Sequence, residues 1–231
     1  MTRLQTEALV VRTVEYGESD LIVTLLTEAV GKLGALVRGG RKSARRVGGA
    51  LEPFHTLEAT LEDKGGDLAA MREARLVRMR HGIVASLDAM DAAGTALRWA
   101  RHLFPVRTRE PEGYAVIVEL LDRLDEGVSP RAELAGAGLR LLAAVGYALD
   151  FERCVSCGKP CPAGRPSGVD GARGGLMCRA CGGGRRTFDA ELRAVGQALQ
   201  RGERPDVSAT QAEAMLALVD DAMAAHAGFE R

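Results

Sequence analysis

Residues 54–76, FHTLEATLEDKGGDLAAMREARL, decide the architecture of the first part of the chain. Apolar and polar side chains alternate through residues 54–62, which is the period of a β-strand with one buried face. The residues expected to share that face are His55, Leu57, Ala59 and Leu61. Residues 63–67, DKGGD, have the composition of a hairpin turn, so residues 68–76 are the returning strand. The stretch therefore predicts an antiparallel hairpin.

Three more strands are expected before this hairpin. Residues 8–12 are rich in β-branched side chains, residues 33–38 alternate, and residues 21–27, LIVTLLT, are almost continuously apolar. Such an apolar run predicts a strand that is buried on both faces. Five short strands without a parallel-sheet pattern predict a small closed β-barrel. The OB-fold is a five-stranded barrel of this kind that binds oligonucleotides, and an SH3-like barrel with the same number of strands is the alternative.

After Arg80 the apolar period becomes helical. Helices are expected at residues 83–104, near 111–127, from Ser129-Pro130 to Leu149, at 190–200, and after a capping box at 208–211, SATQ. Pro105 is expected to end the first of these helices. The fold class is thus α+β and multidomain: a barrel in residues 1–80, followed by an all-α domain in residues 81–231. The α domain carries an inserted cysteine-containing segment at about 152–187.

Four of the five cysteines have the spacing of a zinc finger. They form two Cys-x-x-Cys pairs separated by twenty residues, and the predicted Zn²⁺ ligands are Cys154, Cys157, Cys178 and Cys181. Four thiolates leave no open coordination position, so the ion is expected to be structural. Disulfides or a redox pair are the alternatives, and the absence of a recognisable secretory signal argues against disulfides. Cys161 is left over, either as a replacement for Cys157 or as a bystander.

The charge is balanced overall but unevenly distributed. The chain contains 31 basic and 31 acidic residues, yet residues 153–188 carry seven bases and one acid. Residues 29–51 contain six bases and no acid. Two basic segments in a neutral chain suit a polyanion-binding face, and solvated loops are the plainer alternative. No apolar run has the length of a membrane helix. With no signal peptide recognised, a cytoplasmic protein without membrane contact is expected.

No catalytic constellation is recognisable. The sequence lacks a phosphate-binding Gly-x-x-x-x-Gly-Lys-Ser/Thr loop, a His-Glu-x-x-His motif and a Gly-x-Ser-x-Gly motif. The four histidines are scattered and none is paired with a nucleophile in the sequence. We therefore expect a binding protein rather than an enzyme.

Several motifs in a fixed order resemble the RecO family of recombination mediators. In the first half they are ALV at 8–10, YGESD at 16–20, LLT at 25–27, GK at 31–32, RG at 38–39 and LEPF at 51–54. In the second half they are LL at 141–142, GY at 146–147, CVSCG at 154–158 and GLMCRAC at 175–181. The resemblance spans most of the chain. Residues 81–130 and the last 40 residues contain no such motif and are included only because of their position between or after the motifs.

The resemblance implies an OB-fold domain, a helical domain with a zinc finger, and a role in DNA repair by homologous recombination. Such proteins bind single- and double-stranded DNA and anneal complementary strands. They work with RecR, and often RecF, to load RecA onto DNA that is coated by single-strand binding protein. This implies a cytoplasmic protein that associates with the nucleoid during repair.

We expect the basic residues of both segments to hold DNA through phosphate contacts, which carry no sequence information. The first group is Lys32, Arg38, Arg41, Lys42, Arg45 and Arg46; the second is Arg173, Arg179, Arg185 and Arg186. A protein-interaction scaffold with incidental DNA affinity and an RNA-binding OB protein with a zinc ribbon remain alternatives.

Overall fold

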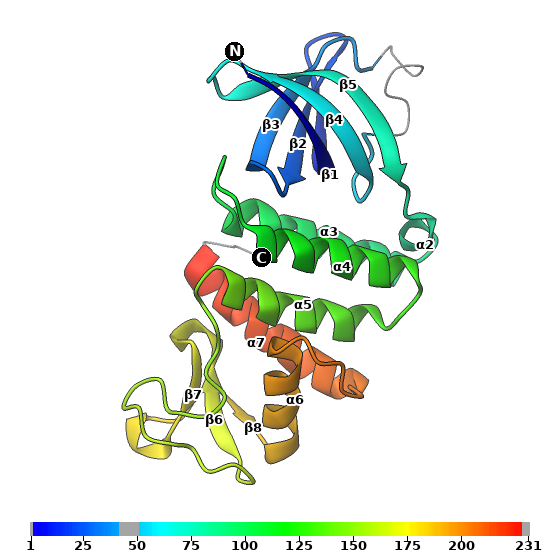
Figure 1. Ribbon diagram of the computed structural model, residues 1–231. Helices are drawn as coiled ribbons and strands as arrows, with labels where there is room; N and C mark the ends of the chain where they lie inside the picture. Colours follow the sequence, from blue (N-terminus) through cyan, green and yellow to red (C-terminus); the bar gives the residue numbers. More distant parts are fainter. Residues whose placement is uncertain (1, 42–50, 228–231) are drawn as a thin grey trace.

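A computed structural model describes residues 2–41 and 51–227 of the chain. The first part contains the five predicted strands, β1 (Thr2–Tyr16), β2 (Asp20–Thr27), β3 (Gly31–Val37), β4 (Thr56–Asp63) and β5 (Leu68–Arg78). They form a closed barrel in the order β1-β2-β3-β5-β4, in which β1 also pairs with β4 (Figure 1). The hairpin that the alternating sequence predicts is the β4–β5 pair.

One pairing differs from the sequence expectation. β3 and β5 run parallel over residues 34–36 and 68–70, although the sequence shows no parallel-sheet pattern. The cause is geometric, because strands cannot alternate in direction around a ring with an odd number of strands. One pair must be parallel, and here it is the shortest pairing in the barrel.

The two faces of β2 and β3 point to different surroundings. Leu25 belongs to the core of the barrel, whereas Leu26 belongs to the core of the helical part, so this end of β2 is buried on both faces as predicted. In β3 the inward-facing residues are Leu33, Ala35 and Val37. Lys32 and Gly34 alternate with them and therefore lie on the outer face of the barrel.

The helical part begins directly after β5. Its helices are α2 (His81–Val84), α3 (Leu87–Leu103), α4 (Pro111–Asp125), α5 (Pro130–Ala144), α6 (Ala190–Gln200) and α7 (Ala209–Ala227). The helix predicted at residues 83–104 is divided at Ala85 and Ser86. The Ser86 hydroxyl accepts a hydrogen bond from the Ala89 backbone N–H, which starts α3 as a separate helix. α3 ends before Pro105, as expected.

Small residues in α5 allow its neighbours to approach closely. A Cβ atom on Gly138 would lie 2.6 Å from Val219 of α7 and 3.0 Å from the ring of Trp99 of α3. Trp99 is completely buried there, so it belongs to the core and forms no surface pocket. Among the helices described, none combines the length and apolar character needed to span a bilayer.

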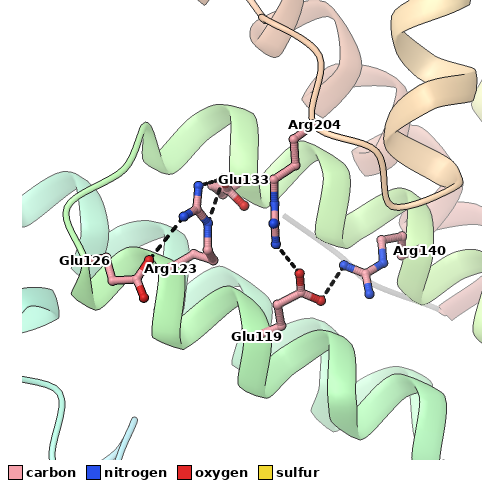
Figure 2. Close-up of polar contacts among 6 residues, drawn as sticks. All are labelled: Glu119, Arg123, Glu126, Glu133, Arg140 and Arg204. Carbon is pink, nitrogen blue, oxygen red and sulfur yellow. Dashed lines mark hydrogen bonds and ion pairs between the residues drawn. The ribbon is translucent and has the colours of Figure 1, made fainter.

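Ion pairs join α4 to α5 and to the segment before α7 (Figure 2). Glu119 of α4 accepts hydrogen bonds from Arg140 of α5, at 2.8 Å, and from Arg204. Arg123, one helical turn further along α4, donates to Glu133 of α5 at 3.0 Å. Because these side chains are partly exposed, each pair contributes little to stability alone, but together they align the three segments.

The inserted segment contains a small sheet that was not expected from the sequence. Strands β6 (Ser167–Asp170), β7 (Gly175–Met177) and β8 (Arg186–Phe188) pair in the order β7-β6-β8. Each is three or four residues long, too short to give a recognisable alternation. The segment lies at the opposite end of the molecule from the barrel (Figure 1).

A buried arginine joins the barrel to the helices. The Arg80 side chain is 0% exposed, and its Nε donates to the Asp122 carboxylate of α4 at 2.7 Å. Its Nη1 donates to the Phe54 carbonyl at 2.5 Å and to the Thr56 hydroxyl at 3.1 Å. Thr56 is therefore buried, although the alternation of β4 placed it on the polar face. Arg78 also pairs with Asp122, from a more exposed position.

We predict that Arg80→Met lowers the free energy of unfolding by about 3 kcal/mol, because it leaves buried acceptors without a donor. Arg78→Met is the matched control, since it removes the other cation from the same carboxylate at an exposed position. Its expected cost is below about 1 kcal/mol. Urea titrations followed by circular dichroism measure both; equal costs would contradict a special role for Arg80.

Candidate metal centre and nucleic-acid interface

Two tight turns bring the four predicted cysteine ligands together. Cys154 and Cys157 lie in one turn, closed by the Gly158 N–H donating to the Cys154 carbonyl at 2.8 Å. Cys178 and Cys181 lie in the other, at the short 3₁₀ helix η2 (Arg179–Cys181) that follows β7. The Val155 N–H donates to the Leu176 carbonyl at 2.9 Å, which fixes one turn against the other.

The four sulfurs have the arrangement of a metal site. All four Sγ atoms lie within 4.8 Å of one another, and those of Cys157 and Cys178 are 3.8 Å apart. Such separations fit four sulfurs on one tetrahedrally coordinated ion. The chain can therefore hold a metal ion at this position.

The surroundings of two of these thiols shift their pKa values in opposite directions. The backbone N–H of Cys178 donates to the Cys154 sulfur at 3.3 Å, and this bond leads the causes that lower the pKa of Cys154 to about 6. The Ser156 hydroxyl lowers the pKa of Cys181, but the sulfurs of Cys178 and Cys157 outweigh it and raise that pKa to about 11. Four thiolates so close together repel one another unless a cation lies between them.

Cys161 lies outside this group of four sulfurs. It is buried, and burial is the main cause that raises the pKa of its thiol. Its carbonyl accepts a hydrogen bond at 2.9 Å from Arg193 of α6. Arg193 is itself buried and also donates to the carbonyls of Phe151 and Pro162, so it fastens the loop to the helix. Arg193 could not be recognised from the sequence, because an arginine in an amphipathic helix gives no signal of burial.

The basic residues predicted to hold DNA fall into distinct environments. Lys32 is half-buried on the outer face of β3, and Arg38 is exposed just after that strand. Arg41 is paired with Glu15 of β1 at 3.4 Å. Lys42, Arg45 and Arg46 lie outside the described residues. The structure thus places Lys32 on the outer face of β3 and Arg38 in the turn that follows this strand.

The second basic group lies in the inserted segment that carries the metal centre, and two of its four members form ion pairs. Arg173 and Arg179 are exposed. Arg185 pairs with Asp170, and Arg186 pairs with Asp221 of α7 at 2.9 Å. The charge of Arg186 therefore serves to attach the insert to α7, and Arg173 and Arg179 are the members of this group with exposed side chains and no ion pair among the described residues.

A cavity of about 610 Å³ opens on the outer face of β2 and β3. Its barrel side contains Thr24, Lys32 and Gly34, with the β4–β5 turn at residues 65–67 along the rim. Arg101 of α3 and residues 106–107 complete it from the helical part. The face of strands 2 and 3, together with the loop between strands 4 and 5, is where OB-folds bind oligonucleotides and oligosaccharides.

The fold and the sites define a class: a protein with a closed five-stranded barrel, a helical part packed on it, and a four-cysteine candidate metal centre at the far end. Residues 1–80 match the N-terminal region of recombination protein O, and residues 85–231 match its C-terminal region. The chain therefore belongs to the RecO family, as its motifs predicted.

Curated relatives agree with this assignment. A protein of Anaeromyxobacter sp. (strain K) named DNA repair protein RecO is 39% identical over 187 residues, which are 80% of this chain and 72% of the relative. A protein of Geobacter sulfurreducens with the same name is 36% identical over 79% of this chain and 74% of its own length. One from Pelobacter propionicus is 33% identical over 96% of this chain and 91% of its own.

We predict that Cys154→Ser releases the metal ion and lowers the melting temperature, because tetrathiolate sites contribute directly to folding. Cys161→Ala is the matched control and is expected to retain the ion. Elemental analysis of the purified variants, with melting curves before and after addition of a chelator, measures both effects. Retention of full metal content by Cys154→Ser would remove that thiol from the ligand set.

Proposed function

We propose that this protein is a recombination mediator that binds single- and double-stranded DNA and anneals complementary strands. Membership of the RecO family, together with a cationic cavity on the β2–β3 face of the barrel, carries the proposal. The barrel is then an OB-fold domain at residues 1–80, and residues 81–231 are a helical domain. The protein acts by binding, so the role requires no catalytic residue.

The proposed DNA contacts are to phosphates. Lys32 lies on the outer face of β3, and Arg38 lies just after the end of this strand, six residues further along the chain, which is about 20 Å if that stretch is extended. This separation spans several phosphates of an extended single strand. Contacts to phosphate position the nucleic acid without reading its sequence, as a mediator that acts at any site requires.

We infer that the ion held by Cys154, Cys157, Cys178 and Cys181 is Zn²⁺. An all-thiolate tetrahedral donor set without an open position is typical of structural zinc. The ion holds the turns of the insert together, so that Arg173 and Arg179 are presented on an ordered surface. In this role zinc supplies stability and takes no part in a reaction.

The proposed partners are RecR, single-strand binding protein and, in addition, RecF. By joining them the protein helps load RecA onto DNA coated by single-strand binding protein. These steps take place where the chromosome lies, so we place the protein in the cytoplasm, at the nucleoid during repair.

We expect the protein to anneal complementary oligonucleotides, one of them coated by single-strand binding protein, faster than they anneal alone and without ATP. The rate should fall at high salt, because phosphate binding releases counterions. A fluorescence-quenching assay at two salt concentrations measures it. No annealing, with intact binding to single-strand binding protein, would instead favour the scaffold, and tighter binding to RNA than to DNA would favour the RNA-binding alternative.

The double variant Lys32→Gln/Arg38→Gln is expected to flatten the salt dependence of single-stranded DNA binding. Each lost phosphate contact lowers the slope of log K against log salt by about 0.7. The matched control is Arg131→Gln/Arg201→Gln, which removes two exposed arginines that form surface ion pairs with Glu213 and Glu203. Fluorescence anisotropy at several salt concentrations gives the slopes, and an equal slope for both variants would overturn the assignment to β3.

A further inference from the structure

Two of four neighbouring cations from the barrel and α3 line the cavity on the outer face of β2 and β3, and the other two, Arg12 and Arg98, are close enough to act on Arg101. Lys32 and Arg101 both line it, and the Lys32 ammonium donates a hydrogen bond to the Arg101 carbonyl. Arg98 lies one helical turn before Arg101 and so shares its face of α3. Arg12 of β1 pairs in register with Thr24, which lines the cavity, and Thr24 pairs with Gly34, which also lines it.

No acidic side chain compensates these four charges within the part of the chain that the structure describes. None of Arg12, Lys32, Arg98 and Arg101 forms an ion pair there, whereas most other described arginines do. The acid that lines the cavity, Asp67, acts on Arg107, which is already paired with Asp63. The cavity is therefore cationic on its β3–α3 side and neutralised on its β4–β5 side.

The partial burial of these cations and their proximity lower the pKa of both Lys32 and Arg101. Burial, followed by repulsion from Arg101, lowers the pKa of Lys32. Burial likewise lowers the pKa of Arg101, with further contributions from Arg12 and Arg98. Like charges held together and partly removed from water are unfavourable unless an anion joins them.

The cavity also offers apolar surface beside the charges. Val106 is 61% exposed and lines the opening. The N–H of Arg107 donates to the Lys32 carbonyl at 2.8 Å, so this segment is fixed against β3. At Gly34 the absence of a side chain lets Leu68 pack closely against β3, because a Cβ there would lie 2.6 Å from the Leu68 side chain. Cations next to a small apolar surface match a nucleotide, which carries a phosphate beside a sugar and a base.

We propose that Arg12 and Lys32 of the barrel and Arg98 and Arg101 of α3 form one phosphate-binding site, so that the helical part contributes directly to holding a single strand of DNA. This rests on the proposed DNA-binding function and extends it: the binding surface is composite and continues from the barrel onto α3. The rigid attachment of the barrel to the helices then becomes a requirement for binding, because it sets the spacing of the four cations.

Binding of a fluorescent oligo(dT) to the full-length protein tests the proposal. Arg98→Gln/Arg101→Gln is expected to weaken binding about 10- to 100-fold at low salt and to lower the salt slope by about 1.4. Arg131→Gln/Arg201→Gln again serves as the control that removes two arginines elsewhere. Arg98→Lys/Arg101→Lys keeps the charges and is expected to retain most of the slope.

The outcomes separate the inference from the function on which it rests. If Arg98→Gln/Arg101→Gln binds like the control pair while Lys32→Gln/Arg38→Gln is weakened, the composite site is wrong and DNA binding by the barrel stands. If the unsubstituted protein binds no DNA, the proposed function fails as well. Melting curves check folding, and if the α3 variant is destabilised, Arg12→Gln/Arg98→Gln, at two exposed positions, replaces it with the same expected loss.

Discussion

The burial of the Arg80 guanidinium at the junction constrains the whole molecule. A buried cation is tolerated only where acceptors surround it, and here they come from two sources: Asp122 of α4, and the Phe54 carbonyl and Thr56 hydroxyl at the start of β4. The Phe54 backbone adopts a positive φ of 75° beside this contact, a conformation that non-glycine residues adopt rarely. This side chain therefore ties the start of β4 to α4 at the junction between the barrel and the helices.

This junction gives the cavity on the barrel its chemical character. Lys32 and Gly34 belong to an ordinary outward face of a strand, and alone they would form an exposed and weakly charged surface. The packing of α3 and residues 106–107 against β3 turns this surface into a concave site. A site made from two parts of the chain is only as well ordered as the junction between them.

The metal centre shows the same dependence on distant residues. The four cysteines set their own local geometry through two tight turns, but the insert that carries them has a sheet of only three very short strands. The insert is attached by contacts with the helices. Arg193 of α6 donates hydrogen bonds to carbonyls of the loop, and Arg186 pairs with Asp221 of α7. A metal ion would stabilise the turns, whereas the arginines hold the insert against the helices.

The sequence by itself determined the features that depend on local pattern. Alternation defined β4, Pro105 ended α3, the Ser208 capping box began α7, and the Cys-x-x-Cys spacing brought four sulfurs together. Only the tertiary structure decided which charged residues find partners inside the fold, as Arg80, Arg186 and Arg193 do, and which form no ion pair among the described residues, as with Arg12, Arg98 and Arg101. The reason is physical: backbone preference and apolar period act over a few residues, whereas the partner of a charge is set by chain segments that meet only in the folded state.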